Sequence, residues 1–185
     1  MVLTFCAGVS LQSVDESLNL ELKARDSAPE RTVRACEELG AEGGGVLRQR
    51  DVYFSVPHGR LKLRYENDGI AQLIAYERPD DQGVKASRYR VMPVIAAAEL
   101  EAALSAALGV VVEVRKTRRL FLYDGVRIHL DRVEGLGRFI ELEALADPAG
   151  GDRAGREKVL GELRNALGVG DDDLVAGSYC ELVLV

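Results

Sequence analysis

The sequence predicts an α+β protein with one large antiparallel β-sheet. Three segments of the 185-residue chain have the apolar spacing of amphipathic helices, and a glycine directly follows each of them. Glycine is the residue that most readily adopts the left-handed backbone conformation that ends a helix. The intervening segments alternate apolar and polar residues, which is the period of a β-strand, and short loops rich in Asn, Asp and Gly join several of them as hairpins.

The helices are expected at about residues 29 to 39, 94 to 108 and 153 to 167. The five prolines each stand beside a change of pattern, where a proline can begin a helix or end a strand. They therefore separate elements rather than domains. The length of the chain is also that of one domain, which we expect to span residues 1–185.

The alternating segments define the strands of the expected sheet. The glycine cluster EGGG at 42 to 45 is interpreted as a loop, and it lacks the following Lys-Ser/Thr of a phosphate-binding loop. Gly135 and Gly137 stand between two strands rather than between a strand and a helix, which argues against a dinucleotide-binding fingerprint. The expected strands are residues 18–25, 52–56, 60–66, 71–78, 86–91, 110–118, 120–123, 126–132, 138–145 and 180–184.

The composition is that of a soluble globular protein, with 47% hydrophobic residues, 29% charged residues and a net charge of −6. The acidic balance argues against nucleic acid as a partner. No apolar run approaches the roughly 20 residues that span a bilayer, and no basic region precedes an apolar N-terminal segment. We therefore expect no membrane segment, no signal peptide and a cytoplasmic location. The three cysteines are scattered, without a CxxC pair, and are expected to be reduced.

The charge is unevenly distributed along the chain. Segment 115 to 132 holds six basic and two acidic residues, a local balance of +4. Segment 141 to 173 holds nine acidic and four basic residues, a local balance of −5. An acidic protein can therefore still contain a concentrated cationic site.

Several strands segregate their charged residues onto one face. In LNLELKAR, the leucines and the alanine point one way, while Asn19, Glu21, Lys23 and Arg25 point the other, because successive side chains of a strand alternate. The polar faces of four further strands carry Arg60, Lys62 and Arg64, then Lys116 and Arg118, then Arg127, His129 and Asp131, and finally Glu141 and Glu143.

Two arrangements fit these faces. For any single strand, an open sheet with its polar face in water is the simpler interpretation. The set of strands also fits a closed barrel with the charged faces inward and three helices outside. Such a lumen must hold water, ions or a ligand, because burying an unpaired charge costs several kcal/mol. Its many Lys and Arg residues suit a polyanion, while its carboxylates suit Mg²⁺ or Mn²⁺, so the combination predicts a metal-bound polyphosphate.

The same residues carry a family resemblance. Segment NLELKAR at 19 to 25 resembles the N-terminal ExExK signature of the CYTH superfamily, the triphosphate tunnel metalloenzymes. The resemblance continues through VRKTRRLFL at 114 to 122 and VRIHLDRVEGLGRFIELE at 126 to 143, and it extends to GSYCELVL at 177 to 184. It therefore covers nearly the whole chain, and it is strongest toward the bacterial class IV adenylate cyclase-like and thiamine triphosphatase-like branch.

The resemblance implies an eight-stranded antiparallel barrel whose tunnel takes a triphosphate together with Mg²⁺ or Mn²⁺. Asp131 is implied as a metal ligand or as an orienting group. Asn19 stands where the family has its first glutamate, and its amide oxygen can ligate a hard metal ion but brings no charge. The implied metal ligands besides Asp131 are Glu21, Glu141 and Glu143, and the implied phosphate-binding residues are Lys23, Arg25, Arg60, Lys62, Arg64, Arg78, Lys85, Lys116, Arg118 and Arg127. The expected catalytic residues are Glu21, Lys23, Arg64, Lys116, Arg118, Glu141 and Glu143.

Three activities fit this set of residues. The first is metal-dependent hydrolysis of inorganic triphosphate, a nucleoside triphosphate or thiamine triphosphate. The second is an adenylate cyclase that makes cyclic AMP and pyrophosphate from ATP, and the third is a non-catalytic binder of polyphosphate or nucleotide. His129 fits either a general acid or base or a packed barrel residue, and it is left outside the catalytic set. The chain fits a monomer or a homodimer.

Overall fold

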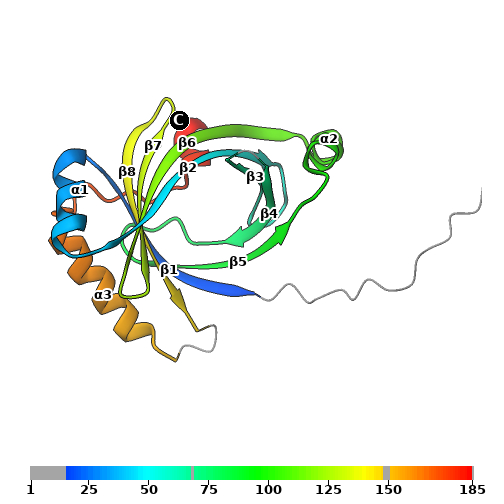
Figure 1. The fold of residues 1–185 in the computed structure, drawn as a ribbon. Helices are drawn as coiled ribbons and strands as arrows, with labels where there is room; N and C mark the ends of the chain where they lie inside the picture. The colour runs from blue at the N-terminus through cyan, green and yellow to red at the C-terminus, as the bar shows by residue number, and fades with distance from the viewer. Residues whose placement is uncertain (1–15, 68, 148–150, 185) are drawn as a thin grey trace, which may run out of the picture.

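The described residues of the computed structural model, 16–67, 69–147 and 151–184, form a closed eight-stranded antiparallel barrel with four helices (Figure 1). The α+β fold class and the barrel are therefore confirmed. The N-terminal segment, where no signal peptide is expected, and Cys6 lie outside the described residues. The strands are β1 (Ser17–Arg25), β2 (Glu42–Phe54), β3 (Arg60–Glu66), β4 (Ile70–Glu77), β5 (Lys85–Pro93), β6 (Val110–Tyr123), β7 (Val126–Val133) and β8 (Gly137–Ala146).

The strands close in the order β1-β5-β4-β3-β2-β6-β7-β8, and β8 pairs back onto β1. The helices are α1 (Pro29–Glu38), α2 (Ala97–Leu108), α3 (Arg153–Ala166) and α4 (Tyr179–Leu184). Figure 1 shows α1 and α3 together on one side of the barrel and α2 on the other. No helix among the described residues is long and apolar enough to cross a membrane.

The largest hydrophobic core lies outside the barrel, between its wall and the helices. The outward side chains of β1 and β8, such as Leu20 and Leu142, are fully buried and belong to one cluster with Leu160 and Leu163 of α3 and Cys36 of α1. Burying one such leucine contributes about 1.5–3 kcal/mol. The apolar faces of β1 and β8 are covered from outside, and the charged faces of these two strands are turned into the lumen.

The structure corrects the loop expected at 42 to 45, which is the beginning of β2. This part of β2 pairs with β6, and the register shifts between Gly43 and Gly45, as in a β-bulge. A Cβ added to Gly44 would lie 2.7 Å from the Leu120 side chain, so the close approach of β6 requires a glycine. The glycines therefore serve a bulge inside a strand rather than a loop.

The strand expected at 180 to 184 is also wrong, because these residues belong to α4. The amide of Ser178 donates to Oε2 of Glu181 at 2.6 Å, and the amide of Glu181 faces Oγ of Ser178 at 3.5 Å. This reciprocal pair is a capping box, which starts a helix. Tyr179 and Cys180 then pack against Tyr53 and other barrel residues. The two strands expected at 110–118 and 120–123 are a single strand, β6.

Candidate active site

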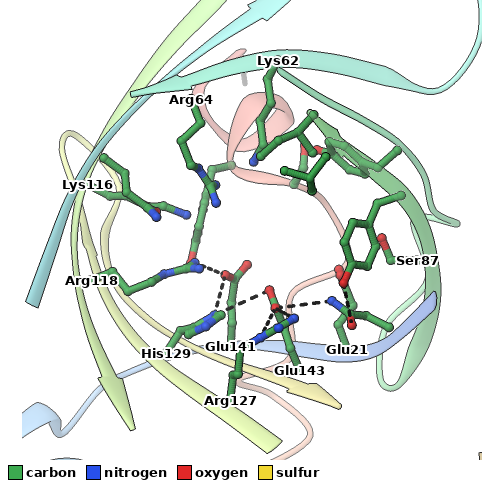
Figure 2. A pocket seen from close by; sticks show the side chains of 18 of the residues that line it. Glu21, Lys62, Arg64, Ser87, Lys116, Arg118, Arg127, His129, Glu141 and Glu143 are labelled. Atoms are coloured by element: carbon green, nitrogen blue, oxygen red, sulfur yellow. Dashed lines mark hydrogen bonds and ion pairs between the residues drawn. The ribbon is translucent and has the colours of Figure 1, made fainter. Parts of the chain in front are cut away.

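A cavity of about 400 Å³ occupies the lumen, and side chains from all eight strands line it. This volume is within the range of roughly 300–1,000 Å³ that is typical of small-molecule sites. Figure 2 shows the labelled cationic and carboxylate side chains pointing inward around it. Seven of the expected phosphate-binding residues line the cavity, namely Lys23, Lys62, Arg64, Arg78, Lys116, Arg118 and Arg127.

One wall of the lumen is cationic and is organised by a buried aspartate on β2. Nζ of Lys62 lies 2.9 Å from Oδ2 of Asp51, and Nε of Arg64 donates to Oδ1 at 2.7 Å. Burial alone would raise the pKa of Asp51, but the charges of Arg64 and Lys62 hold this pKa well below its usual range. Burial, reinforced by Arg64, lowers the pKa of Lys62 to about 7. Asp51 therefore holds two cations in fixed positions facing the cavity.

A second buried aspartate, Asp131 on β7, holds Arg118. Nε and Nη2 of Arg118 donate to the two carboxylate oxygens of Asp131 at 2.7 and 2.6 Å. The hydroxyl of Tyr179 donates to Oδ2 at 3.0 Å, and Nζ of Lys116 lies 3.5 Å from the same oxygen. Asp131 is absent from the residues that line the lumen cavity. These contacts suit the orienting group that the sequence analysis gave as one alternative, and the metal-ligand role of Asp131 stays a prediction.

The opposite wall holds a cluster of candidate metal ligands from β7 and β8. One ligand atom each of His129, Glu141 and Glu143 lies within 4.8 Å of the others. Cations neutralise the two carboxylates: Nζ of Lys23 lies 2.8 Å from Oε1 of Glu141, and Nη2 of Arg127 lies 2.9 Å from Oε2 of Glu143. Two carboxylates and an imidazole form a donor set that fits a divalent cation.

The protonation states in this cluster follow from burial and neighbouring charge. Burial alone would raise the pKa of Glu141, but Lys23 and Arg118 hold it well below its usual range. Burial and the charge of Arg118 lower the pKa of His129, which favours the neutral imidazole. Deprotonated carboxylates and a neutral imidazole are the forms that bind a metal ion.

Glu21 lies on β1 directly across from Glu143, and it forms an ion pair with Arg78. Burial raises the pKa of Glu21, with Arg78 acting in the opposite direction. Glu21 is not part of the three-residue cluster around His129. Asn19, one step along the same face, places its amide nitrogen 3.5 Å from Oε2 of Glu143.

Arg25 and Arg60, two expected phosphate-binding residues, do not line the cavity. Arg25 is exposed and donates to the carbonyl oxygen of Leu136 at 3.3 Å. Arg60 forms ion pairs with Glu181 of α4 and with Asp80. Both arginines lie at ends of their strands, so the polar face of each strand extends beyond the cavity.

Lys85 is the third expected phosphate-binding residue that does not line the cavity. Its ammonium donates to the backbone carbonyls of Asp81 at 2.9 Å, Val175 at 3.3 Å and Ala176 at 2.5 Å. Burial lowers the pKa of Lys85 to about 8. In this structure, Lys85 fastens the segment before α4 to the barrel.

The sequence did not assign a role to Asp51, and it left His129 undecided. Asp51 alternates with Gln49 and Tyr53, and both of these line the lumen. This alternation was a usable signal for an inward carboxylate. The position of His129 beside Glu141 depends on the register between β7 and β8, in which these two residues stand directly opposite each other.

A model of the CYTH domain family matches residues 17–179, and the chain belongs to this family. The family resemblance of the sequence motifs is therefore confirmed. Among curated proteins, the chain is similar to "Putative adenylate cyclase MJ0240" of Methanocaldococcus jannaschii. The two share 25% identity over 175 residues, which cover 89% of this chain and 98% of the relative.

Solved structures show the same fold. The PH1012 protein of Pyrococcus horikoshii OT3 superposes with a TM-score of 0.75 and 25% identity, over 89% of this chain and 98% of that one. The PH1819 protein of the same organism has a TM-score of 0.73 and 27% identity, and the match covers 90% of this chain and 98% of that one. HpAC1 of Hippeastrum has a TM-score of 0.60 and 14% identity, and the match covers 88% of this chain and 91% of that one. The barrel is thus shared across archaeal and plant proteins.

Proposed function

We propose that the protein is a divalent-metal-dependent triphosphatase that hydrolyses a terminal phosphoanhydride bond inside the barrel, with Mg²⁺ or Mn²⁺. The observation that carries the proposal is the lumen itself, where a fixed cationic wall faces a cluster of metal-binding side chains. Hydrolysis of a phosphoanhydride requires charge neutralisation and in-line positioning more than covalent chemistry from the protein. Both are supplied by these two walls.

The cationic wall binds and orients the substrate. Lys62, Arg64 and Arg118 contact non-bridging phosphate oxygens, and the guanidinium groups make bidentate contacts where the geometry allows. Asp51 and Asp131 stand behind these three cations and keep them in position before the substrate arrives. Preorganised charges of this kind stabilise the transition state without a cost of reorganisation during the reaction.

The carboxylate wall holds the metal ion. Glu141 and Glu143, with Glu21 nearby, are the proposed ligands, and Lys23 and Arg127 turn from these carboxylates toward phosphate when substrate enters. A divalent ion held there would supply charge neutralisation at the phosphate oxygens and activation of a water molecule. In the net hydrolysis, a water oxygen bonds to the terminal phosphorus, the bond between this phosphorus and the bridging oxygen breaks, the bridging oxygen leaves with the diphosphate part of the substrate, and the proton released by the water passes to solvent.

Adenylate cyclase activity is the second candidate, because the relative MJ0240 carries the name "Putative adenylate cyclase". In that reaction the ribose 3′-hydroxyl replaces water, and pyrophosphate leaves. We favour hydrolysis because a triphosphate clamp with water is the less demanding arrangement. The structure of HpAC1, which has the same fold, is described as revealing a dominant triphosphatase activity.

A panel of substrates and metals with product identification tests the proposal. Tripolyphosphate, ATP and thiamine triphosphate are each incubated with Mg²⁺ or Mn²⁺. Orthophosphate as the main product supports the triphosphatase, whereas cyclic AMP with pyrophosphate identifies a cyclase. Binding by calorimetry without turnover of any of the three would leave a non-catalytic binder and overturn both enzymatic functions.

The proposal extends to the substrate, the oligomeric state and the cellular location of the protein. The protein binds a small-molecule triphosphate as a monomer or a homodimer, and it acts in the cytoplasm. Gel filtration with light scattering distinguishes the two oligomeric states.

A further inference from the structure

We infer that His129 is a direct ligand of the metal ion, so that the lumen holds a mixed nitrogen–oxygen centre made by His129, Glu141 and Glu143. This inference deepens the proposed function and rests on it, because the ion concerned is the one that the proposed reaction uses. It assigns a role to His129, for which the sequence analysis left two alternatives open, a general acid or base and a packed barrel residue.

The register of two adjacent strands places the three residues together. His129 on β7 stands directly opposite Glu141 on β8, and Glu143 lies two residues along the same face. Figure 2 shows all three side chains reaching into the lumen from this corner of the barrel. Because paired strands are rigid, the cluster is built into the barrel and does not depend on a loop.

The distances fit one ion after a small closure. Nδ1 of His129 lies 3.5 Å from Oε1 of Glu143 and 3.9 Å from Oε2 of Glu141. The ligand atoms of the three residues lie within 4.8 Å of one another. Three ligands at roughly 2.0–2.2 Å from one ion stand about 3–4 Å apart on average, so both distances from Nδ1 already fit and a wider pair needs to close by about 1 Å or less.

Nδ1 of His129 is the observation that points to a ligand. The residue is only 4% exposed, and Nδ1 is buried without a hydrogen-bond partner. A buried polar atom without a partner destabilises the folded state, because it has lost its hydrogen bonds to water. Among the described residues only four buried side-chain atoms are in this state, and this one faces two carboxylates. A metal ion between the three groups would give Nδ1 a partner and would bind one oxygen of each carboxylate.

The nitrogen ligand has a consequence for metal choice. Mg²⁺ strongly prefers oxygen ligands and keeps several of its waters, whereas first-row transition ions accept imidazole. The centre therefore favours Mn²⁺ over Mg²⁺ more than a site made only of carboxylates. We expect His129→Gln to weaken Mn²⁺ binding at least about tenfold and to change Mg²⁺ binding by less than about threefold.

Pulsed electron paramagnetic resonance of bound Mn²⁺ tests the ligation directly and needs no turnover. The protein is prepared without a histidine tag and loaded with Mn²⁺ alone. A coordinated imidazole nitrogen gives a ¹⁴N modulation of the electron spin echo, which a carboxylate does not. The chain contains two histidines, so His58→Gln, a change in an exposed position, leaves His129 as the only histidine.

The decisive sample is His58→Gln protein grown with ¹⁵N-histidine, in which His129 itself is unchanged. The inference predicts a ¹⁴N signal in the unlabelled His58→Gln protein that is replaced by ¹⁵N coupling in the labelled one, and that is lost in His129→Gln. A missing nitrogen coupling with Mn²⁺ bound, a ¹⁴N signal that survives the labelling, or no Mn²⁺ binding at millimolar concentration overturns it. Nitrogen coupling without phosphate release in the substrate panel would instead contradict the proposed function alone.

Discussion

The two faces of β8 divide the work of the molecule. On the outer face, Ile140 and Leu142 are almost fully buried in the core cluster that includes Leu160 of α3. On the inner face, Glu141 and Glu143 reach the lumen and face cations and His129. Because side chains alternate along a strand, consecutive residues serve stability and chemistry in turn. Substitutions on the two faces should therefore have separable effects.

The largest effect is expected from the inner face. Replacing Glu141 and Glu143 together by Gln removes two charged ligands while keeping side-chain volume. We expect metal-dependent turnover to fall about a thousandfold, since the electrostatic contribution of a bound metal ion is worth several kcal/mol. Initial rates of phosphate release measure the loss. Wild-type rates in the double variant would contradict the assignment of Glu141 and Glu143 as metal ligands.

The outer face is tested by Leu142→Ala, which removes a side chain with no exposed surface. The free energy of unfolding should fall by about 2–5 kcal/mol, as it does when a cavity is made in a packed core. Leu145→Ala, at a leucine of the same strand that is 54% exposed, is the matched control and should cost less than about 0.5 kcal/mol. Urea unfolding measures both. An equal loss of unfolding free energy in the two variants would contradict the contrast between the faces. A loss of turnover in folded Leu142→Ala protein would contradict it too.

Asp51 refines the comparison, because it is an inward residue that we expect to affect stability. Asp51→Asn leaves Lys62 and Arg64 without their counter-charge, and the free energy of unfolding should fall by about 1–3 kcal/mol. A bound polyanion then replaces the missing charge, so tripolyphosphate should raise the melting temperature more in Asp51→Asn than in the wild type. Thermal melts with and without the ligand check this. The same shift in both proteins would mean that the cationic wall does not meet the ligand.

The smallest effect is expected from Lys62, whose pKa is lowered to about 7 mainly by burial. The ammonium is charged below this pH and neutral above it, so positive charge on the wall is lost as the pH rises. We expect the affinity for tripolyphosphate to fall by up to about tenfold between pH 6 and pH 8, which corresponds to about 1.4 kcal/mol. Calorimetry at each pH measures the affinity. Lys62→Arg stays charged throughout and should lack this fall, and an equal fall in the variant would assign it to another group.

Much of the barrel was predictable from the sequence, because strands with one apolar and one charged face repeat a local pattern. Strands β1, β3, β7 and β8 were placed to within one residue at each end. The glycine-rich start of β2 was not, since glycine signals loops as well as bulges. The terminal helix was missed although Ser178 and Glu181 form a capping box. A short apolar segment fits both the helix and the strand period. The capping box was the local signal that favoured a helix.

The candidate site was less predictable than the fold, because the alternation of side chains shows which face a residue is on but not where it lies along the barrel axis. Lys85 shares the inward-facing pattern of the strands, yet its ammonium group donates hydrogen bonds to backbone carbonyls and does not line the cavity. Asp51 and His129 acquire meaning only through the neighbours that the register gives them. Sequence therefore identified the charged face, and the fold decided which of its residues meet in one cavity.

A crystal structure with Mn²⁺ and a non-hydrolysable triphosphate tests the central claim most directly. The account predicts an anomalous manganese peak in the lumen beside Glu141 and Glu143, with phosphate groups on Lys62, Arg64 and Arg118. A triphosphate bound on the outer surface, with the lumen empty of both metal and phosphate, would contradict it.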